Sequence, residues 1–345
     1  MKSRRTLLAA SVIALGGLAA AACSSSSSSS TPTASSSSTA ASSGSSVNLS
    51  SVTLNVGDQK GTGAEAVLKA AGLLSTLPFK VSWSDFTSGP PMLEAMASGS
   101  VDVGGVGDAP PVFAASGGEQ VEIVGARSVP SGDQDALVVP KGSSITSIQQ
   151  LKGKKIAYGS GSSANYHLLT VLNKAGLTTK DVTLVNLQPA NALAAFTSGA
   201  VDAWDIWPPY VQQVVAQNGA KVLAIGSQYG SPYSFEVASK AAVANAEKAA
   251  AIKVYLATLN KAYVFTATHP DVWGAAWGAA SGLPASITTE AAKVDATTPV
   301  TITSAVISSE QNLVSQFYKA GLIPNNVDMT GFITSEFNST VAESG

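Results

Sequence analysis

The chain has 345 residues, of which 45% are hydrophobic and 12% are charged, with 20 basic and 22 acidic side chains. A charge set this sparse, slightly acidic and without a basic stripe excludes a surface that follows phosphate backbones, so we expect no nucleic-acid partner. It also leaves no basic cluster to attract anionic lipid. The single cysteine excludes a disulfide within the chain.

The first 48 residues have the composition of export and attachment signals. Residues 1–22 join a basic start to an apolar run shorter than a membrane span, which predicts a signal peptide. Cys23 follows four alanines, and this stretch resembles a bacterial lipoprotein cleavage box, which implies that Cys23 carries a lipid. Residues 23–48 are mostly Ser, Thr and Ala, and we expect them to form a flexible tether.

Short runs typical of strands then alternate with runs typical of helices. The strand-like runs are residues 51–57, 79–86, 101–107, 121–127, 134–140, 154–159, 182–187, 201–206, 220–226 and 234–239. The helical runs between them are residues 64–74, 90–99, 110–116, 165–176, 191–199 and 208–219, and the chain is mainly helical from about residue 241. This order predicts an α/β protein with mostly parallel sheets covered by helices.

The alternation occurs in two similar sets, which predicts two lobes. We assign residues 49–130 and 231–345 to lobe 1 and residues 131–230 to lobe 2. The segments "LEAMASGSVDVGGVGDAPP" (93–111) and "LAAFTSGAVDAWDIWPPY" (193–210) each carry a small turn, Val-Asp, a short strand and a Pro pair. Because ligands bind at the carboxyl ends of strands in such sheets, we expect these two strand ends to face a shared cleft.

The stretch "IAYGSGSSANYHLL" (156–169) runs from a strand through a Gly/Ser turn into a helix. A turn of this kind leaves unpaired backbone N–H groups at the positive end of the helix dipole, which favours an anion. The turn lacks the Lys of a P-loop and the third Gly of a dinucleotide fingerprint, so the anion is not expected to be a nucleotide. The alternative is an ordinary loop with Ser162 or Ser163 as a helix cap.

Several motifs together are similar to one known family. "GDQKGTG", "FTSGPPMLEAMASGSVDVGGVGDAPPVFAASGG", "LKGKKIAYGSGSSANYHLLTVLNKAGL" and "GAVDAWDIWPPYV" resemble the aliphatic-sulfonate branch of the substrate-binding proteins of ABC transporters, a group that includes taurine, nitrate and pyrimidine-precursor binders. The resemblance covers nearly all of residues 51–335. It implies a type II periplasmic-binding-protein fold, a monomer without a cofactor, a small anionic ligand held between hinged lobes, and a permease with its ATPase as partners.

The resemblance also implies the ligand-binding residues. They are Gln59 and Lys60 after the first strand, Gly89 and Pro90 in a turn, Gly107 and Asp108 at a strand end, Ser162 and Ser163 before the anion-seating helix, and Trp204 and Trp207. The chain departs from the family at Val106, Asp205 and Pro208, where sulfonate binders usually carry Thr, an apolar residue and Asp. These departures concern the identity of the ligand.

A sulfonate is always ionised and only accepts hydrogen bonds, so its site should offer donors. The backbone N–H groups of Ser163 and Ala164, with the hydroxyls of Ser162 and Ser163, are the expected donors. Asp205 in the site would attract an ammonium group and favour taurine, although strand alternation turns it away from Trp204.

Four of the implied site residues have simpler alternative roles. Lys60 is a candidate counter-charge or a solvated surface residue, and Asp108 is a ligand contact or the cap of the next helix. Trp204 and Trp207 either form an apolar wall for the ligand or pack between sheet and helix.

An enzyme is the less favoured interpretation. The two histidines, His167 and His269, accompany no Ser or Cys nucleophile motif, and no His, Cys or carboxylate spacing is typical of a metal site. A thiamine-precursor enzyme of related fold needs catalytic cysteines, whereas Cys23 lies in the tether. A binder of nitrate or of a pyrimidine-type precursor stays an alternative, and a surface scaffold would leave the anion-seating turn unexplained.

Overall fold

The structure, a computed structural model, describes residues 47–59 and 63–343. The predicted signal segment, Cys23 and nearly all of the predicted tether lie outside the described residues, as does Lys60. Strands and helices between residues 51 and 239 follow the predicted order, so the α/β class is confirmed.

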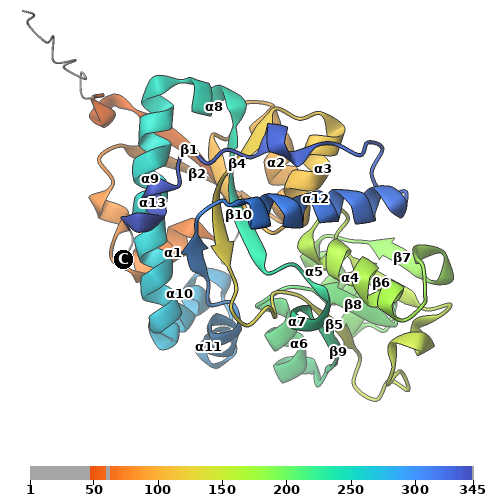
Figure 1. Ribbon diagram of the computed structural model, residues 1–345. Helices are drawn as coiled ribbons and strands as arrows, with labels where there is room; N and C mark the ends of the chain where they lie inside the picture. Colours follow the sequence, from red (N-terminus) through yellow and green to blue (C-terminus); the bar gives the residue numbers. More distant parts are fainter. Residues whose placement is uncertain (1–46, 60–62, 344–345) are drawn as a thin grey trace, which may run out of the picture. The chain divides into compact units, whose positions relative to one another are not determined.

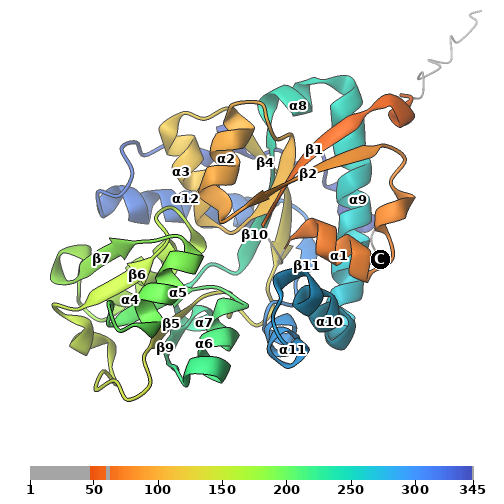
Figure 2. The same ribbon diagram turned by 180° about the vertical axis from the view of Figure 1, so that it is seen from behind.

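The first sheet has the strand order β11-β4-β10-β3-β1-β2 (Figures 1 and 2). Its strands are β1 (Thr53–Gln59), β2 (Lys80–Phe86), β3 (Val103–Val106), β4 (Val121–Ser128), β10 (Tyr233–Ser239) and β11 (Thr298–Val300). Strand β11 was not predicted from the sequence. It pairs only with the edge of β4 and contains Pro299, which lacks the N–H that a central strand needs.

The second sheet has the order β7-β6-β8-β5-β9. Its strands are β5 (Ala136–Val139), β6 (Lys155–Tyr158), β7 (Thr183–Asn186), β8 (Ala203–Ile206) and β9 (Lys221–Ile225). The chain passes from the first sheet to the second after β4 and returns between β9 and β10. The division into lobes at residues 130 and 231 stays a prediction.

Most strands of each sheet run in one direction, as the sequence predicted, but both sheets are mixed. β10 runs antiparallel to β3 and β4, and β5 runs antiparallel to β8 and β9. Each of these is the first strand after a crossing between sheets. The chain that crosses between the sheets enters each sheet at the edge where the carboxyl ends of the parallel strands lie. The first strand after the crossing therefore runs antiparallel to them.

Helices cover both faces of each sheet (Figures 1 and 2). They are α1 (Ala64–Ala70), α2 (Gly89–Ala97), α3 (Ala109–Gly117), α4 (Ser163–Lys174), α5 (Pro189–Thr197), α6 (Tyr210–Asn218), α7 (Gly226–Tyr229), α8 (Lys240–Ala244), α9 (Ala246–Thr268), α10 (Pro270–Ser281), α11 (Ala285–Val294), α12 (Ser304–Lys319) and α13 (Ser339–Ala342). Short 3₁₀ helices span Leu49–Ser51, Leu74–Thr76, Ile148–Leu151, Thr179–Asp181 and Met329–Phe332. Among the described residues, no helix combines the length and the apolar character that a membrane crossing needs.

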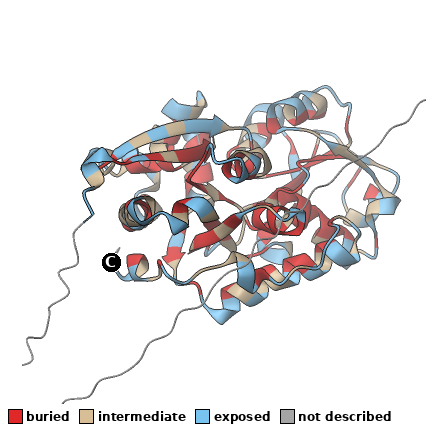
Figure 3. Cartoon of the chain, turned by 90° about the horizontal axis from the view of Figure 1, so that it is seen from above, coloured by how far each residue is buried: buried red, intermediate tan, exposed pale blue. Residues whose placement is uncertain are grey.

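The cores follow from alternation along the strands. In β4, Ile123 packs with α2, α3 and α12 on one face of the first sheet, while Val124 packs with α1, α9 and α10 on the other. In the second sheet, β8 alternates in the same way between a core under α4 and a core under α5 and α6. Figure 3 shows the buried residues concentrated on the strands and on the helix faces turned toward them.

The first sheet depends on two glycines where α2 crosses β1 and β3. A Cβ atom on Gly104 would lie 2.5 Å from the Met92 sulfur and 2.7 Å from the Gly57 carbonyl oxygen. A Cβ atom on Gly57 would lie 2.6 Å from the Met92 side chain. Neither position has room for a side chain.

We therefore expect Gly104→Ala to lower the free energy of unfolding by about 1–3 kcal/mol through overpacking. Gly331→Ala is the matched control, because a Cβ atom there meets nothing within 4 Å. Urea unfolding followed by circular dichroism measures both. Equal stability of the two variants would show that the crossing is looser than described.

Candidate ligand-binding site

A pocket of about 130 Å³ lies where strands of both sheets reach their carboxyl ends. Six of the residues expected to bind the ligand line it, namely Gln59, Gly89, Gly107, Ser162, Ser163 and Trp207, and so do Val106 and Pro208, two of the departures from the family. Gln59 is the last residue of β1, while Gly107 and Trp207 directly follow β3 and β8. The expected convergence of strand ends from both sheets is therefore present.

Besides α1, whose first residue Ala64 lines the pocket, three helices begin at this pocket. Gly89 is the first residue of α2, Gly107 lies two residues before α3, and Ser163 is the first residue of α4. Helix N-termini carry unpaired N–H groups and partial positive charge, so their convergence produces a positive potential without a charged side chain. The segment before α3 and the start of α4 lie close together, since a Cβ atom on Gly107 would lie 2.9 Å from Ser163 Cβ.

The donors at α4 are backbone groups rather than hydroxyls. Ser162 Oγ donates to the Gly159 carbonyl at 2.7 Å, and Ser163 Oγ donates to Asp135 Oδ1 at 2.9 Å. The N–H groups of Ser163 and Ala164 have no acceptor among the described residues. The hydroxyls brace the turn in this structure and the N–H groups are left for a ligand, so the role of the hydroxyls as donors to a ligand stays a prediction. Ala164 itself is buried and does not line the pocket.

Asp205 is placed differently from the expectation. It is fully buried on the α4 side of β8, where both of its carboxylate oxygens lie 2.9 Å from His167 Nδ1. The neighbouring Asp205 carboxylate raises the pKa of His167 to about 9, against the opposing effect of burial. Because this pair lies outside the pocket lining, Asp205 cannot meet an ammonium group of the ligand.

Trp204 also belongs to the core. It is fully buried between Phe196 and Tyr210, with ring centroids 5.9 and 5.8 Å away, and it does not line the pocket. Strand alternation sends Trp204 and Asp205 to opposite faces of β8, and both faces are covered by helices. Trp207, beyond the end of the strand, is the tryptophan that reaches the pocket.

Asp108 and Pro90 lie behind the pocket rather than on its wall. Asp108 occupies the cap position of α3 but makes no side-chain cap bond, and its Oδ1 has no partner. Burial, and then Asp135, raise the pKa of Asp108 well above its ordinary value. Pro90 packs beneath Gly161 in the α4 turn, where a Cβ atom would lie 3.4 Å from its ring.

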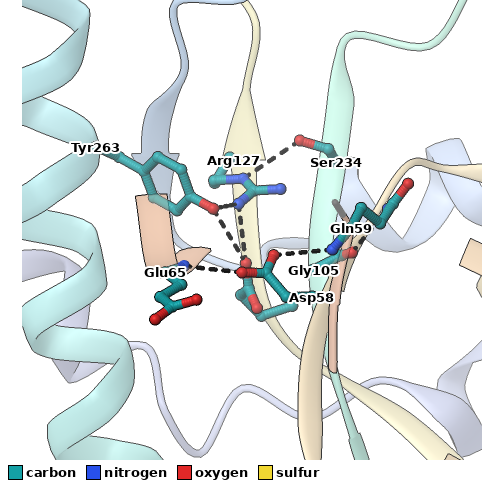
Figure 4. Close-up of polar contacts among 8 residues, drawn as sticks. Asp58, Gln59, Glu65, Gly105, Arg127, Ser234 and Tyr263 are labelled. Atoms are coloured by element: carbon teal, nitrogen blue, oxygen red, sulfur yellow. Dashed lines mark hydrogen bonds and ion pairs between the residues drawn. The ribbon is translucent and has the colours of Figure 1, made fainter. Parts of the chain in front are cut away.

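The far end of the pocket holds residues that the sequence analysis missed. Arg127, Tyr263, Asp295 and Asp58 line it, and Figure 4 shows Arg127 next to Tyr263 and Ser234. Arg127 Nη1 donates to Glu236 Oε1 at 2.8 Å and to the Tyr263 hydroxyl, and Nε donates to Ser234 Oγ at 3.4 Å. A charged residue within the strand-like run "VEIVGAR" was the available signal.

Asp58 serves the fold at this end. Its two carboxylate oxygens accept the backbone N–H groups of Gln59, at 2.8 Å, and Glu65, at 3.0 Å (Figure 4). Burial raises the pKa of Asp58 to about 6 despite these bonds. The carboxylate therefore caps the first turn of α1 from the end of β1, and this helix start already has its own anion.

Residues 88–272 match the family described as NMT1/THI5 like. The chain belongs to this family. An Escherichia coli K12 protein named for binding aliphatic sulfonates is 36% identical over 286 residues, which cover 81% of this chain and 88% of that protein. The resemblance to aliphatic-sulfonate-binding proteins that the motifs predicted is confirmed.

Two further relatives support the same placement within the NMT1/THI5-like family. The taurine-binding periplasmic protein of E. coli K12 is 36% identical over 150 residues, covering 44% of this chain and 45% of that protein. The alkanesulfonate-binding protein SsuA from Xanthomonas axonopodis pv. citri, solved with bound MOPS, has 31% identity and a TM-score of 0.76. That match covers 83% of this chain and 99% of the other.

The His167–Asp205 pair makes stability depend on pH. The pKa of His167 is raised from 6.5 to about 9, so its contribution is complete below about pH 6.5 and is lost as pH rises through 9. We expect urea unfolding to show a loss of stability between pH 7 and pH 10. In Asp205→Asn this part of the loss should be missing.

Proton NMR of the imidazole rings measures the same pair directly. His167 should stay protonated up to about pH 8 in the wild-type protein and titrate lower in Asp205→Asn, while the exposed His269 supplies a second signal as reference. A wild-type His167 that is neutral at pH 7 would contradict the ion pair.

Proposed function

We propose that the protein binds a small aliphatic sulfonate outside the cytoplasm and delivers it to an ABC importer. The observation that carries the proposal is the meeting of the N-termini of α2, α3 and α4 at one small pocket, with an unused N–H group at Ser163 in its lining. The relatives named for binding aliphatic sulfonates, alkanesulfonate and taurine support this ligand class.

The chemistry of this end of the pocket suits a sulfonate. Three oxygens share one negative charge that no physiological pH removes, and each oxygen accepts hydrogen bonds. The pocket residues at or next to the starts of α2, α3 and α4 and the end of β8 include Gly89, Gly107, Ser162, Ser163 and Trp207, none of which carries a carboxylate. The N–H groups supply the donors, and the Trp207 side chain supplies an apolar wall for the carbon atoms of the ligand.

Binding without catalysis is the role that we propose. His167 is fully buried and ion-paired with Asp205, away from the pocket lining, so it is not placed for proton transfer to a bound molecule. The two groups nearest the open N–H donors, the serine hydroxyls, are held by acceptors of the protein itself.

We propose that two lobes of the protein close over the ligand when it binds. The pocket takes its lining from both sheets, which are joined by the chain crossings before β5 and before β10. We propose that residues 49–130 with 231–345, and residues 131–230, move as two bodies about these crossings when the ligand binds.

The succession of a basic start, an apolar run and then Cys23 supports export of the protein and a lipid anchor at Cys23. The relative named as periplasmic supports a location outside the cytoplasm. We propose that the protein is a monomer held at the outer face of the cytoplasmic membrane, where it meets a permease and its ATPase.

The open N–H group is tested by Ser163→Pro against Ser163→Ala. Both variants lose the hydroxyl bond to Asp135, but only proline removes the N–H. Proline is tolerated at the first helical position, and Ser162 before it is already extended, with φ −88° and ψ 170°. We expect Ser163→Pro to bind ethanesulfonate at least about tenfold more weakly than Ser163→Ala in calorimetry. Equal Kd values in two folded variants would remove the N–H group from the site.

The anchor is tested by Cys23→Ala. We expect the wild-type protein in the membrane fraction of cells and the variant in the soluble fraction, because the substitution removes the only thiol to which a lipid can attach. Mass spectrometry of the mature N-terminus is the check on acylation. Recovery of both proteins in the same fraction would contradict the anchor.

A further inference from the structure

The far end of the pocket contains a buried guanidinium with one unused donor. Arg127 is 8% exposed, and its Nε and Nη1 are engaged by Ser234, Glu236 and Tyr263. Its Nη2 has no partner among the described residues, and the side chain lines the pocket. In Figure 4 this nitrogen is the end of Arg127 without a dashed contact. In the pocket, a ligand group that accepts hydrogen bonds can bond to this donor.

A carboxyl group without a partner lies near this guanidinium. Asp295, directly after α11, lines the same pocket, is partly buried, and makes no side-chain hydrogen bond within the described part of the chain. Burial raises the pKa of Asp295 to about 7, while the charge of Arg127 acts in the opposite direction. This carboxyl group offers an acceptor to a ligand group that donates.

The two other carboxyl groups described at this end bond to the protein, although Glu236 Oε2, which does not line the pocket, has no partner. Asp58 accepts two backbone N–H groups, and Glu236 Oε1 accepts from Arg127. Among the described residues that line the pocket, the far end therefore presents to a ligand an unused donor on Arg127 and an unused acceptor on Asp295. A ligand with a plain alkyl tail would bury both without partners, which costs binding free energy.

We propose that the ligand is an α-amino acid that carries a sulfonate, with its sulfonate at the start of α4, its carboxylate on Arg127 and its ammonium group on Asp295. This inference rests on the proposed function, whose sulfonate end it keeps. An amino-acid head supplies a charged acceptor and a charged donor on one carbon atom. The pocket, at about 130 Å³, suits a molecule of this small size.

Four probes of equal carbon spacing separate the two contacts. Ethanesulfonate has neither group, taurine adds the ammonium group, 3-sulfopropanoate adds the carboxylate, and L-cysteate has both. In calorimetry we expect L-cysteate to bind at least about tenfold more tightly than either single-group probe, and ethanesulfonate to bind most weakly. Equal binding of all four probes overturns this inference alone. No binding of any probe overturns the proposed function as well.

Two variants assign the contacts to residues. We expect Asp295→Asn to reduce the preference for taurine over ethanesulfonate about tenfold, and Arg127→Lys to do the same to the preference for 3-sulfopropanoate. Asp295→Asn disturbs no hydrogen bond of the fold, so it keeps the test valid if Arg127→Lys is unstable. Asp271→Asn, at an exposed position of α10, is the control. An unchanged taurine preference in folded Asp295→Asn overturns the inference.

Discussion

The backbone N–H groups of Ser163 and Ala164 have no acceptor among the described residues, and the site depends on this feature. The turn before α4 keeps them available, because the hydroxyls of Ser162 and Ser163 bond to other parts of the protein. Gly161 has a φ of +73°, which only a glycine adopts without strain, and Gly107 leaves room for Ser163 at close approach. The small residues Gly161 and Gly107 thus allow the start of α4, with its unpaired N–H groups, to reach the pocket.

Buried carboxyl groups lie behind this helix start, and the protein compensates them separately. Asp135 accepts the Ser163 hydroxyl, and burial raises the pKa of Asp135 to about 7. His167, held protonated by Asp205, offsets the negative charge that would otherwise oppose an anion. The His167–Asp205 ion pair thus belongs to the core of the second sheet. Its positive charge also reduces the repulsion between the buried carboxyl groups and an anion at the start of α4. A ligand bound at the start of α4 contacts the N–H donors, and the carboxyl groups lie behind these donors.

The sequence predicted most of the fold because the signals are local. Alternating apolar runs and small-residue turns gave the order of strands and helices, and the strand ends that converge were visible as two similar segments. The mixed direction of the sheets was not predictable in this way, since β5 and β10 are reversed by where the chain crosses, which is a long-range constraint. Strand β11 was not predicted because it has only three residues and one of them is Pro299.

The candidate site was predictable only in part. Positions next to strand ends, such as Gln59, Gly107 and Ser163, were found because their place follows from the order of elements. For Trp204 and Asp205 the sequence left both a ligand contact and a core position open, and they are in the core because a four-residue strand with helices on both faces buries a charged residue as well as an apolar one. Arg127 and Asp295 are distant in sequence and lie in elements without a motif. Only packing brings them to one pocket.

The most direct test of the account is whether the pocket requires a negative charge on its ligand. Calorimetry can compare ethanesulfonate with ethyl methyl sulfone, which has a similar shape but no charge. The account predicts that the sulfonate binds and that its affinity falls at least about a hundredfold in the neutral sulfone, because charged hydrogen-bond acceptors are favoured at helix starts. Comparable affinity for the two compounds would contradict it.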